Sequence, residues 1–158
     1  MSRFVFFGLT VLFVVLCFSR ALLFPEPPTG KLGLDLTGCA IEADFDTHGG
    51  FHGDGERYIR VNCSAKAERV GEAVKAWDPL PLTDVLERVM YDDADGYRLA
   101  ERFDIPRVTN GYWFLIDRQA TGEARYRDSD LLGRGSFNFS VAIYDTDTCL
   151  LHYYEIDT

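Results

Sequence analysis

Two alternating stretches on either side of a glycine-rich segment constrain the fold of this chain most strongly. In "CAIEADFD" (39–46) and "RYIRVNC" (57–63), small or apolar side chains alternate with polar ones, as in strands with one buried face. We predict that the two stretches pair as a hairpin, because a shift of one residue would set apolar positions against polar ones. The predicted register places the following residues opposite each other: Cys39 and Cys63, Ile41 and Val61, Ala43 and Ile59, and, on the outer face, Glu42 and Arg60.

The segment between the two predicted strands, "DTHGGFHGDG" (46–55), is the best candidate for a binding site. Phe51 lies at the centre of the predicted hairpin tip. Histidine and carboxylate side chains are ligands for zinc and similar ions, and glycine lets backbone amides approach a bound group closely. The candidate ligand-binding residues are Asp46, His48, Gly49, Gly50, His52 and Asp54, and the candidate metal ligands are Asp46, His48, His52 and Asp54.

The same segment also has a purely structural interpretation. Glycine supplies positive φ angles in a wide hairpin tip, and aspartate and threonine form local hydrogen bonds to the backbone. The histidine spacing matches no metal motif with a known mechanism, such as two histidines on one helix face. Both interpretations stay open at this point.

The first 24 residues direct the chain to a membrane. Residues 4–18 form an unbroken apolar run, "FVFFGLTVLFVVLCF", which "ALLF" extends to Phe24 past Arg20. A membrane-spanning helix needs about 20 residues, so this segment is long enough if Arg20 extends toward the interface. A cleaved signal peptide is the alternative, but no small residues mark a cleavage site. We favour an uncleaved anchor at 1–24, a linker at 25–33 and one globular domain at 34–158.

The charge of the chain argues against nucleic acid as a partner. The chain has 16 Lys and Arg against 25 Asp and Glu, and Arg3 and Arg20 lie in the predicted anchor, which has no acidic residue. The remainder therefore carries 14 basic against 25 acidic residues, a net charge of −11. A domain this acidic, with no basic stripe, is not expected to bind nucleic acid or anionic lipid headgroups.

The rest of the globular domain indicates an α+β fold. One helix is expected in "SAKAERVGEAVKAW", with Ser64 as its cap, and a second in "TDVLERVMY", with Thr83 as its cap; a short helical stretch follows near 97–103. "GYWFLID" (111–117) is apolar on both faces, as in a central strand, and 118–135 reads as a long charged loop. Two final strands surround a "DTDT" turn, with Phe137, Phe139, Val141 and Ile143 on the same face as Leu150, His152, Tyr154 and Ile156. We predict a mainly antiparallel sheet of about five strands, with two or three helices inserted after the first hairpin.

Three cysteines lie outside the predicted anchor. If the domain is exported, the predicted register lets Cys39 and Cys63 form a disulfide across the first hairpin, which leaves Cys149 unpaired. The alternative is that all three are small buried apolar residues. The two interpretations are held as equal.

Three stretches also carry a resemblance. "DTHGGFHGDG", "NGYWFLIDR" and "SFNFSVAIYDTDTCLLHYYEIDT" together resemble a family of small, uncharacterised bacterial proteins of the Gram-positive type, membrane-anchored or exported. The resemblance covers most of the chain after the linker and implies a self-contained domain. It implies no activity, so no functional residue follows from it.

The interpretation that the sequence favours is a membrane-tethered, extracytoplasmic binding or interaction module without catalysis. It would be held in the cell membrane by its N-terminal helix and would meet a protein partner of the cell envelope through the 46–55 loop and nearby acidic surface. One alternative is a metal-dependent hydrolase, in which a divalent ion at the 46–55 loop activates water. Another is a structural accessory subunit of a cell-envelope complex. No cofactor other than that candidate ion is expected, and no catalytic residue is assigned.

Overall fold

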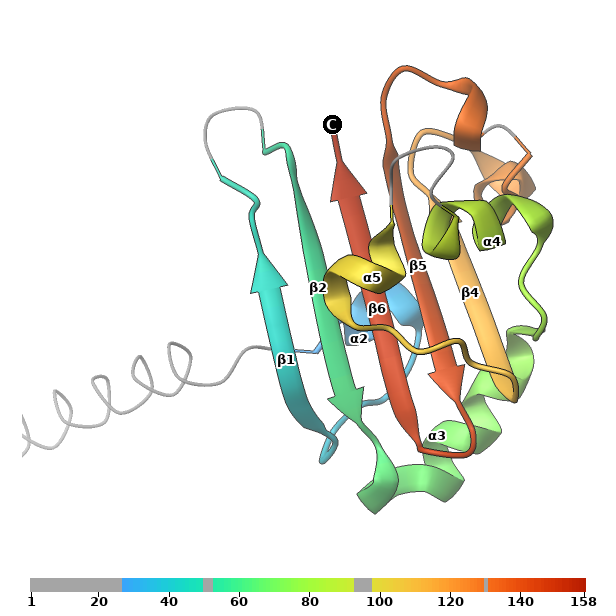
Figure 1. Ribbon diagram of the computed structural model, residues 1–158. Helices are drawn as coiled ribbons and strands as arrows, with labels where there is room; N and C mark the ends of the chain where they lie inside the picture. Colours follow the sequence, from blue (N-terminus) through green and yellow to red (C-terminus); the bar gives the residue numbers. More distant parts are fainter. Residues whose placement is uncertain (1–26, 50–52, 93–97, 130) are drawn as a thin grey trace, which may run out of the picture.

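One antiparallel sheet organises the chain (Figure 1). The computed structural model describes residues 27–49, 53–92, 98–129 and 131–158. Its six strands lie in the order β1-β2-β6-β5-β4-β3. The strands are β1 (Ala40–Asp46), β2 (Gly55–Asn62), β3 (Asp78–Pro79), β4 (Gly111–Asp117), β5 (Asn138–Asp145) and β6 (Leu150–Asp157). The predicted α+β class with an antiparallel sheet is confirmed, and the sixth strand is the two-residue β3.

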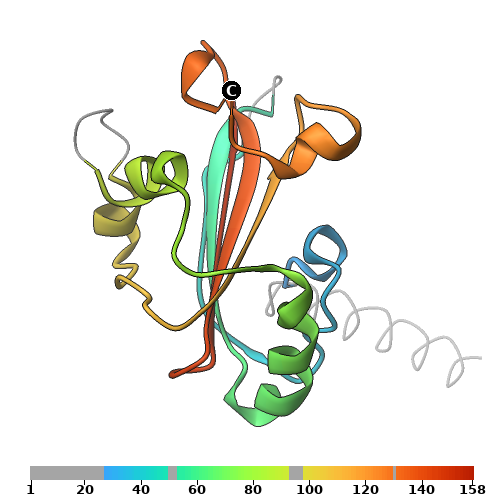
Figure 2. The same cartoon turned by 90° about the vertical axis from the view of Figure 1, so that its right-hand side faces the viewer.

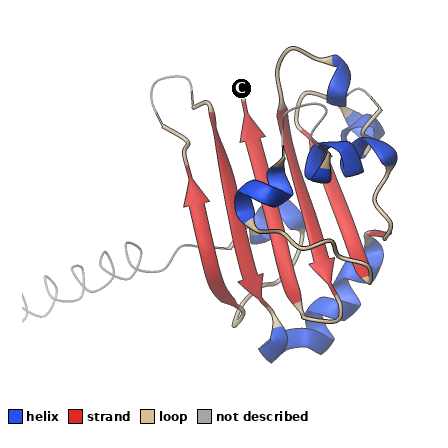
Figure 3. Cartoon of the chain, in the orientation of Figure 1, coloured by secondary structure: helices blue, strands red, loops and turns tan. Residues whose placement is uncertain are grey.

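Helices cover both faces of the sheet, as the view turned by 90° shows (Figure 2), and Figure 3 distinguishes helices from strands by colour. The α-helices are α2 (Thr29–Leu32), α3 (Ala67–Ala73), α4 (Asp84–Tyr91) and α5 (Leu99–Phe103), and the 3-10 helices are η1 (Ser64–Lys66), η2 (Val74–Ala76), η3 (Gly122–Tyr126) and η4 (Leu131–Gly133). Leu32 of α2 and Val70 of α3 pack against one face, here called the α3 face. Leu86 of α4 and Leu99 of α5 pack against the other, here called the α4 face. A core therefore forms on each side of the sheet.

The first hairpin forms as predicted at its open end and departs from the prediction nearer the tip. Ile41 lies opposite Val61, but the register shifts between Ile41 and Ala43, so that Ala43 lies opposite Arg60 instead of Ile59. An extra residue in one strand turns the following side chains to the opposite face. Ala43 consequently packs against the α4-face core, whereas Ile41 packs against the α3-face core. The prediction that β1 keeps one apolar face was wrong for this reason.

The predicted ion pair of Glu42 and Arg60 is present, although the ladder sets Ala43 and not Glu42 opposite Arg60. Glu42 Oε2 lies 3.3 Å from Arg60 Nε. The bulge therefore preserves this charge pair while it changes the positions that follow.

The two predicted helices are present, with one cap predicted correctly. Thr83 accepts a hydrogen bond from the backbone N–H of Leu86 at 3.2 Å and caps α4 as expected. Ser64 does not cap α3, because a turn of 3-10 helix, η1, precedes that helix and no side chain caps it. The stretch predicted near 97–103 contains α5.

The last three long strands agree with the sequence pattern. Trp113 and Leu115 of β4 belong to the α4-face core, and Phe114 packs on the other face, so this strand is covered on both sides. Asp145 pairs with Leu150, which places the turn one residue later than its predicted centre. That offset changes the register by two residues and leaves each side chain on its predicted face. The loop at 118–135 contains the short helices η3 and η4.

The predicted N-terminal anchor falls outside the residues that the structure describes. Among those it describes, no helix has the length and apolar character needed to cross a bilayer.

Candidate binding site at the first hairpin

The α3 face changes from apolar to charged as the sheet approaches the tip of the first hairpin. Asp46, Arg57, Glu155 and Ser140 are successive cross-strand neighbours on β1, β2, β6 and β5. The neighbouring row contains Ile59, Tyr153 and Ala142, which are fully buried in the α3-face core. A row of polar side chains therefore crosses four strands just beyond the core, at the end of the sheet that carries the C-terminus (Figure 1).

The base of the hairpin tip is closed by hydrogen bonds between Thr47 and Glu56. The Thr47 N–H donates to the Glu56 carbonyl at 2.9 Å, and the Glu56 N–H donates to Thr47 Oγ1 at 2.9 Å. Gly55 permits the close approach of the two arms, because a Cβ atom there would lie only 2.5 Å from the Cα atom of His48. This glycine is required by packing against His48.

His48 joins the tip to the last strand. Its backbone N–H and its Nδ1 atom each lie 2.8 Å from Asp46 Oδ1, and its Nε2 atom lies 3.2 Å from Asp157 Oδ2. The two carboxylates therefore hold the His48 ring in one orientation.

The hydrogen bonds from His48 lower the pKa of the Asp46 carboxyl group. Burial alone would raise its pKa, but hydrogen bonds from the backbone and ring of His48 outweigh burial and hold the pKa below its ordinary value. Arg57, at 3.7 Å, adds a smaller effect in the same direction. Arg57 itself binds Asp44 through two hydrogen bonds, at 2.9 and 3.1 Å.

Arg118, which follows β4, joins this polar network by binding the C-terminal end of β6. Its guanidinium donates to Asp157 Oδ1 at 2.5 Å, to the Ile156 carbonyl at 2.9 Å and to Ser140 Oγ. Asp157 is thus shared by Arg118 and His48. This carboxylate therefore links His48 to the loop after β4.

Glu155 is the most deeply buried charged member of the network. Its carboxylate accepts a hydrogen bond from the Tyr153 hydroxyl at 2.6 Å and from the ammonium group of Lys31 in α2. Arg118 lies 3.5 Å from the same carboxylate. Burial, together with the bond to Glu155, raises the pKa of the Tyr153 hydroxyl, so that it remains a donor. The buried charge is therefore paired and hydrogen-bonded, as burial requires.

The structure brings together only part of the predicted 46–55 site. Asp46 and His48 are hydrogen-bonded to each other, while Gly49 and Asp54 are exposed. Gly50 and His52 lie outside the described residues. Within the described chain, no group of three or more His, Cys, Asp or Glu side chains is arranged to hold a metal ion. The four-ligand metal site therefore remains a prediction.

Sequence reasoning missed the partners that the tip acquires from distant segments, namely Lys31, Arg118, Glu155 and Asp157. One signal for them was present, because Glu155 and Asp157 interrupt an otherwise apolar final strand at alternate positions. Alternate positions share one face of a strand. Two carboxylates on the same face of a buried strand require cationic partners, and that requirement could have located the network.

The edge strand β1 provides an exposed surface beside the tip. It is the last strand of the sheet on its side, and its seven residues are mostly exposed. The ring of Phe45 remains 44% exposed, although it contacts Phe103 at a centroid distance of 5.4 Å. The only other large apolar side chain that is exposed in the described chain is Tyr126, at 49%. An open strand edge presents unpaired backbone N–H and C=O groups, which can pair with another extended chain.

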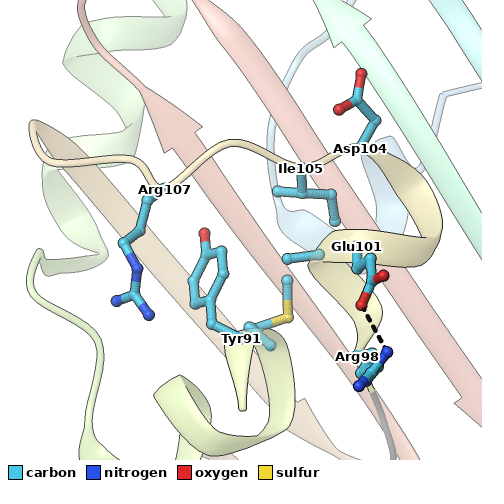
Figure 4. Close-up of a pocket in the computed structure, with 8 residues that line it drawn as sticks. Tyr91, Arg98, Glu101, Asp104, Ile105 and Arg107 are labelled. Atoms are coloured by element: carbon cyan, nitrogen blue, oxygen red, sulfur yellow. Dashed lines mark ion pairs between the residues drawn. The ribbon is translucent and has the colours of Figure 1, made fainter. Parts of the chain in front are cut away.

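A separate pocket of about 420 Å³ lies between α4 and α5 (Figure 4). Four charged residues line it, Arg98, Glu101, Asp104 and Arg107; Arg98 pairs with Glu101 at 3.2 Å, and Arg107 pairs with Glu87, outside the lining, at 2.5 Å. The Arg107 guanidinium also lies 4.5 Å from the centre of the Tyr91 ring. The lining therefore carries two cationic and two anionic side chains, and no net charge favours an anion or a cation.

Comparison of the chain with protein-family models, curated proteins and solved structures finds no match. The resemblance of the three sequence stretches to a bacterial family therefore stays a prediction.

Proposed function

We propose that the chain is a membrane-tethered, extracytoplasmic binding module without catalytic activity, and that its partner binds along β1 beside the hairpin tip. The observation that carries this proposal is the open edge of the sheet at β1, where the exposed Phe45 lies next to a tip held by His48. The apolar segment at residues 4–24 supports the tether.

The backbone of β1 supports binding by strand addition. The bond from the Thr47 N–H to the Glu56 carbonyl identifies these two residues as a hydrogen-bonded pair. Bonded and non-bonded pairs alternate along an antiparallel ladder, so the backbone groups of Asp44 and Asp46 point away from β2. An extended segment of a partner could pair with these groups and place an apolar side chain against Phe45.

The charge of the hairpin favours a basic partner segment. Residues 40–62 contain five acidic side chains, Glu42, Asp44, Asp46, Asp54 and Glu56, and two basic ones, Arg57 and Arg60. Opposite charge steers association and disfavours acidic competitors. The proposed partner is therefore an extended, basic segment of a cell-envelope protein.

The bonding of His48 argues against the alternative of a metal-dependent hydrolase. A metal ligand or a general base needs a ring nitrogen with a free lone pair, and both nitrogens of His48 face carboxylates. In the hydrolase alternative His48 would first have to leave Asp46 or Asp157. The accessory-subunit alternative requires the anchor but not the edge of β1. Substitution of Phe45 should therefore impair a binding module but not an accessory subunit.

Phe45 and Tyr126 offer a matched test of this proposal. Both rings are about half exposed, and each has a tilted ring contact, to Phe103 and Phe114 respectively. We expect Phe45→Glu to abolish co-purification of the partner from detergent-solubilised membranes, and Tyr126→Glu to leave it unchanged. Equal recovery with both variants would contradict binding at β1.

The proposed location needs a separate measurement. A cysteine introduced at Thr121, an exposed residue of the 118–135 loop, should react in whole cells with a thiol reagent that does not cross membranes. The unsubstituted chain measures the background from its own cysteines. If Thr121→Cys adds no labelling until the cells are lysed, the domain is not extracytoplasmic.

A further inference from the structure

Three cysteines meet at the end of the sheet opposite the hairpin tip. Cys39 precedes β1, Cys63 follows β2 and Cys149 precedes β6, at the lower ends of these strands in Figure 1. The pairs Ala40–Asn62 and Asn62–Leu150 end the two ladders. One further residue along each ladder places Cys63 between Cys39 and Cys149. The Cys63 N–H donates to the Cys149 carbonyl at 2.9 Å, which supports this extension.

All three side chains lie on the α3 face. Cys63 is a fully buried member of that core, and the partly buried Cys39 and Cys149 pack against it. Burial raises the pKa of the Cys63 thiol, and the adjacent thiols of Cys39 and Cys149 raise it further. The middle thiol is thus the one shielded from solvent, and the two outer ones are accessible.

The spacing of the strands determines which pairs can form a disulfide. Opposed residues on neighbouring antiparallel strands have Cα atoms about 4.5–5.5 Å apart, within the range of about 4.4–6.8 Å that a disulfide spans. Cys39 and Cys149 are two strands apart, roughly 10 Å, which exceeds that range. Cys63 can therefore pair with either neighbour, but the neighbours cannot pair with each other.

The backbone of Cys149 provides a second observation. This residue has a φ angle of 58°, in the left-handed region that glycine occupies at little cost. A cysteine at this position costs about 1 kcal/mol or more relative to glycine. The turn therefore holds a thiol beside Cys63 at a position where glycine would be more stable.

We propose that Cys39, Cys63 and Cys149 form a thiol–disulfide exchange site, in which Cys63 is the shared partner of the two outer cysteines. The substrate class is a disulfide, R–S–S–R, presented by a small molecule or by another protein. This inference rests on the geometry of the three strands and does not depend on the proposed partner at β1.

The exchange balances in atoms and electrons. The thiolate of Cys39 or Cys149 attacks one sulfur of R–S–S–R, forms a mixed disulfide and releases one R–S⁻. Cys63, after loss of its proton, attacks the sulfur of the outer cysteine and releases the second R–S⁻, so two protein thiols are oxidised and one disulfide is reduced. The thiolates released take up the two protons.

The test uses the full chain in detergent, with Cys17→Ser to remove the cysteine of the N-terminal segment. The reduced protein is oxidised with glutathione disulfide, free thiols are alkylated, and cross-linked peptides are identified by mass spectrometry. We expect both Cys39–Cys63 and Cys63–Cys149 cross-links and no Cys39–Cys149 cross-link. The variant Cys149→Ser should retain only the first and Cys39→Ser only the second.

A Cys63→Ala variant, with circular dichroism as a check on folding, should form no internal disulfide and accumulate glutathione adducts on the outer cysteines. Three results with the protein that retains Cys39, Cys63 and Cys149 would overturn the proposal. These are a Cys39–Cys149 cross-link, a cross-link at only one of the two expected pairs, and complete alkylation of Cys63 after oxidation. The Cys149→Gly variant tests separately whether Cys149 serves stability or disulfide formation. It should be at least as stable as the parent, while losing the Cys63–Cys149 cross-link.

Discussion

His48 Nε2 lies 3.2 Å from Asp157 Oδ2, across a sequence separation of 109 residues. This contact fastens the tip of the first hairpin to the end of the last strand. Asp157 also binds Arg118, so one carboxylate connects three segments that are far apart in the chain. The tip is therefore held by the tertiary structure and not only by its own turn.

The first prediction concerns Asp157. We expect Asp157→Ala to reduce the free energy of unfolding by about 1–3 kcal/mol, because it leaves Arg118 and His48 without their shared acceptor. Urea denaturation measures this change. Asp54→Ala, at an exposed position of the same tip, is the control and should change stability by less than about 0.5 kcal/mol. Equal effects of the two substitutions would mean that the Asp157 network does not hold the tip.

The second prediction concerns Gly55. A methyl group at this position would lie 2.5 Å from the His48 Cα atom, whereas one at Gly49 would meet only the Thr47 carbonyl at 3.8 Å. Gly55→Ala should therefore destabilise the protein by about 1–3 kcal/mol and shift the NMR signals of His48 and Asp157. Gly49→Ala should leave both stability and spectrum nearly unchanged. If Gly55→Ala changes stability and the NMR spectrum as little as Gly49→Ala does, the two arms of the hairpin do not approach each other this closely.

The third prediction is a pH dependence that arises from His152. Burial, and to a smaller extent the charge of Arg60, lower the pKa of this histidine to about 4 from an ordinary value of 6.5. The unfolded chain therefore takes up a proton at a higher pH than the folded protein. His152 contributes its stability fully above about pH 6.5, and the contribution falls as the pH drops from there toward 4.

Unfolding measured between pH 7.5 and 4.5 tests this prediction. The unsubstituted chain should lose roughly 2–3 kcal/mol more than His152→Gln over this interval, because glutamine does not titrate. Comparison of the two slopes removes the contribution of the other histidines. Parallel pH profiles would contradict the lowered pKa of His152.

The fourth prediction concerns divalent metal. Both ring nitrogens of His48 face carboxylates, so a metal ion would have to displace one of these contacts, and zinc or manganese should shift the melting temperature by less than about 1 °C. A larger rise in melting temperature would instead favour the metal-dependent hydrolase if the double substitution His48→Ala and His52→Ala abolishes it. A rise that survives both substitutions would place the metal elsewhere.

Local sequence pattern was sufficient for the elements that local forces determine. Thr83 was predicted as a cap because its hydroxyl serves the helix that follows it, and Ile41 was placed opposite Val61 because alternation defines the buried face. The final hairpin was placed on the correct faces for the same reason. Its register was wrong by two residues, because the period of a strand defines the face of a side chain but not its exact partner.

The features that the sequence did not reveal depend on contacts between distant segments. The bulge after Ile41 lets Ala43 reach the core under α4 and α5, and nothing in the alternation of β1 predicts an extra residue. The site shows the same limit. Asp46 and His48 lie close together because they are two residues apart in the sequence, but their link to Asp157 exists only because β2 and β6 pair in the folded sheet.

Photo-cross-linking at position 45 tests the central claim most directly. A photoreactive amino acid replaces Phe45 in the full chain, and a second protein carries it at Tyr126, the other large apolar side chain that is exposed among the described residues. On irradiation of intact membranes, position 45 should form an adduct with an extended, basic segment of one envelope protein, identified by mass spectrometry, and position 126 should not. An absence of adducts at position 45, or the same adducts at both positions, would contradict a binding module that acts through β1.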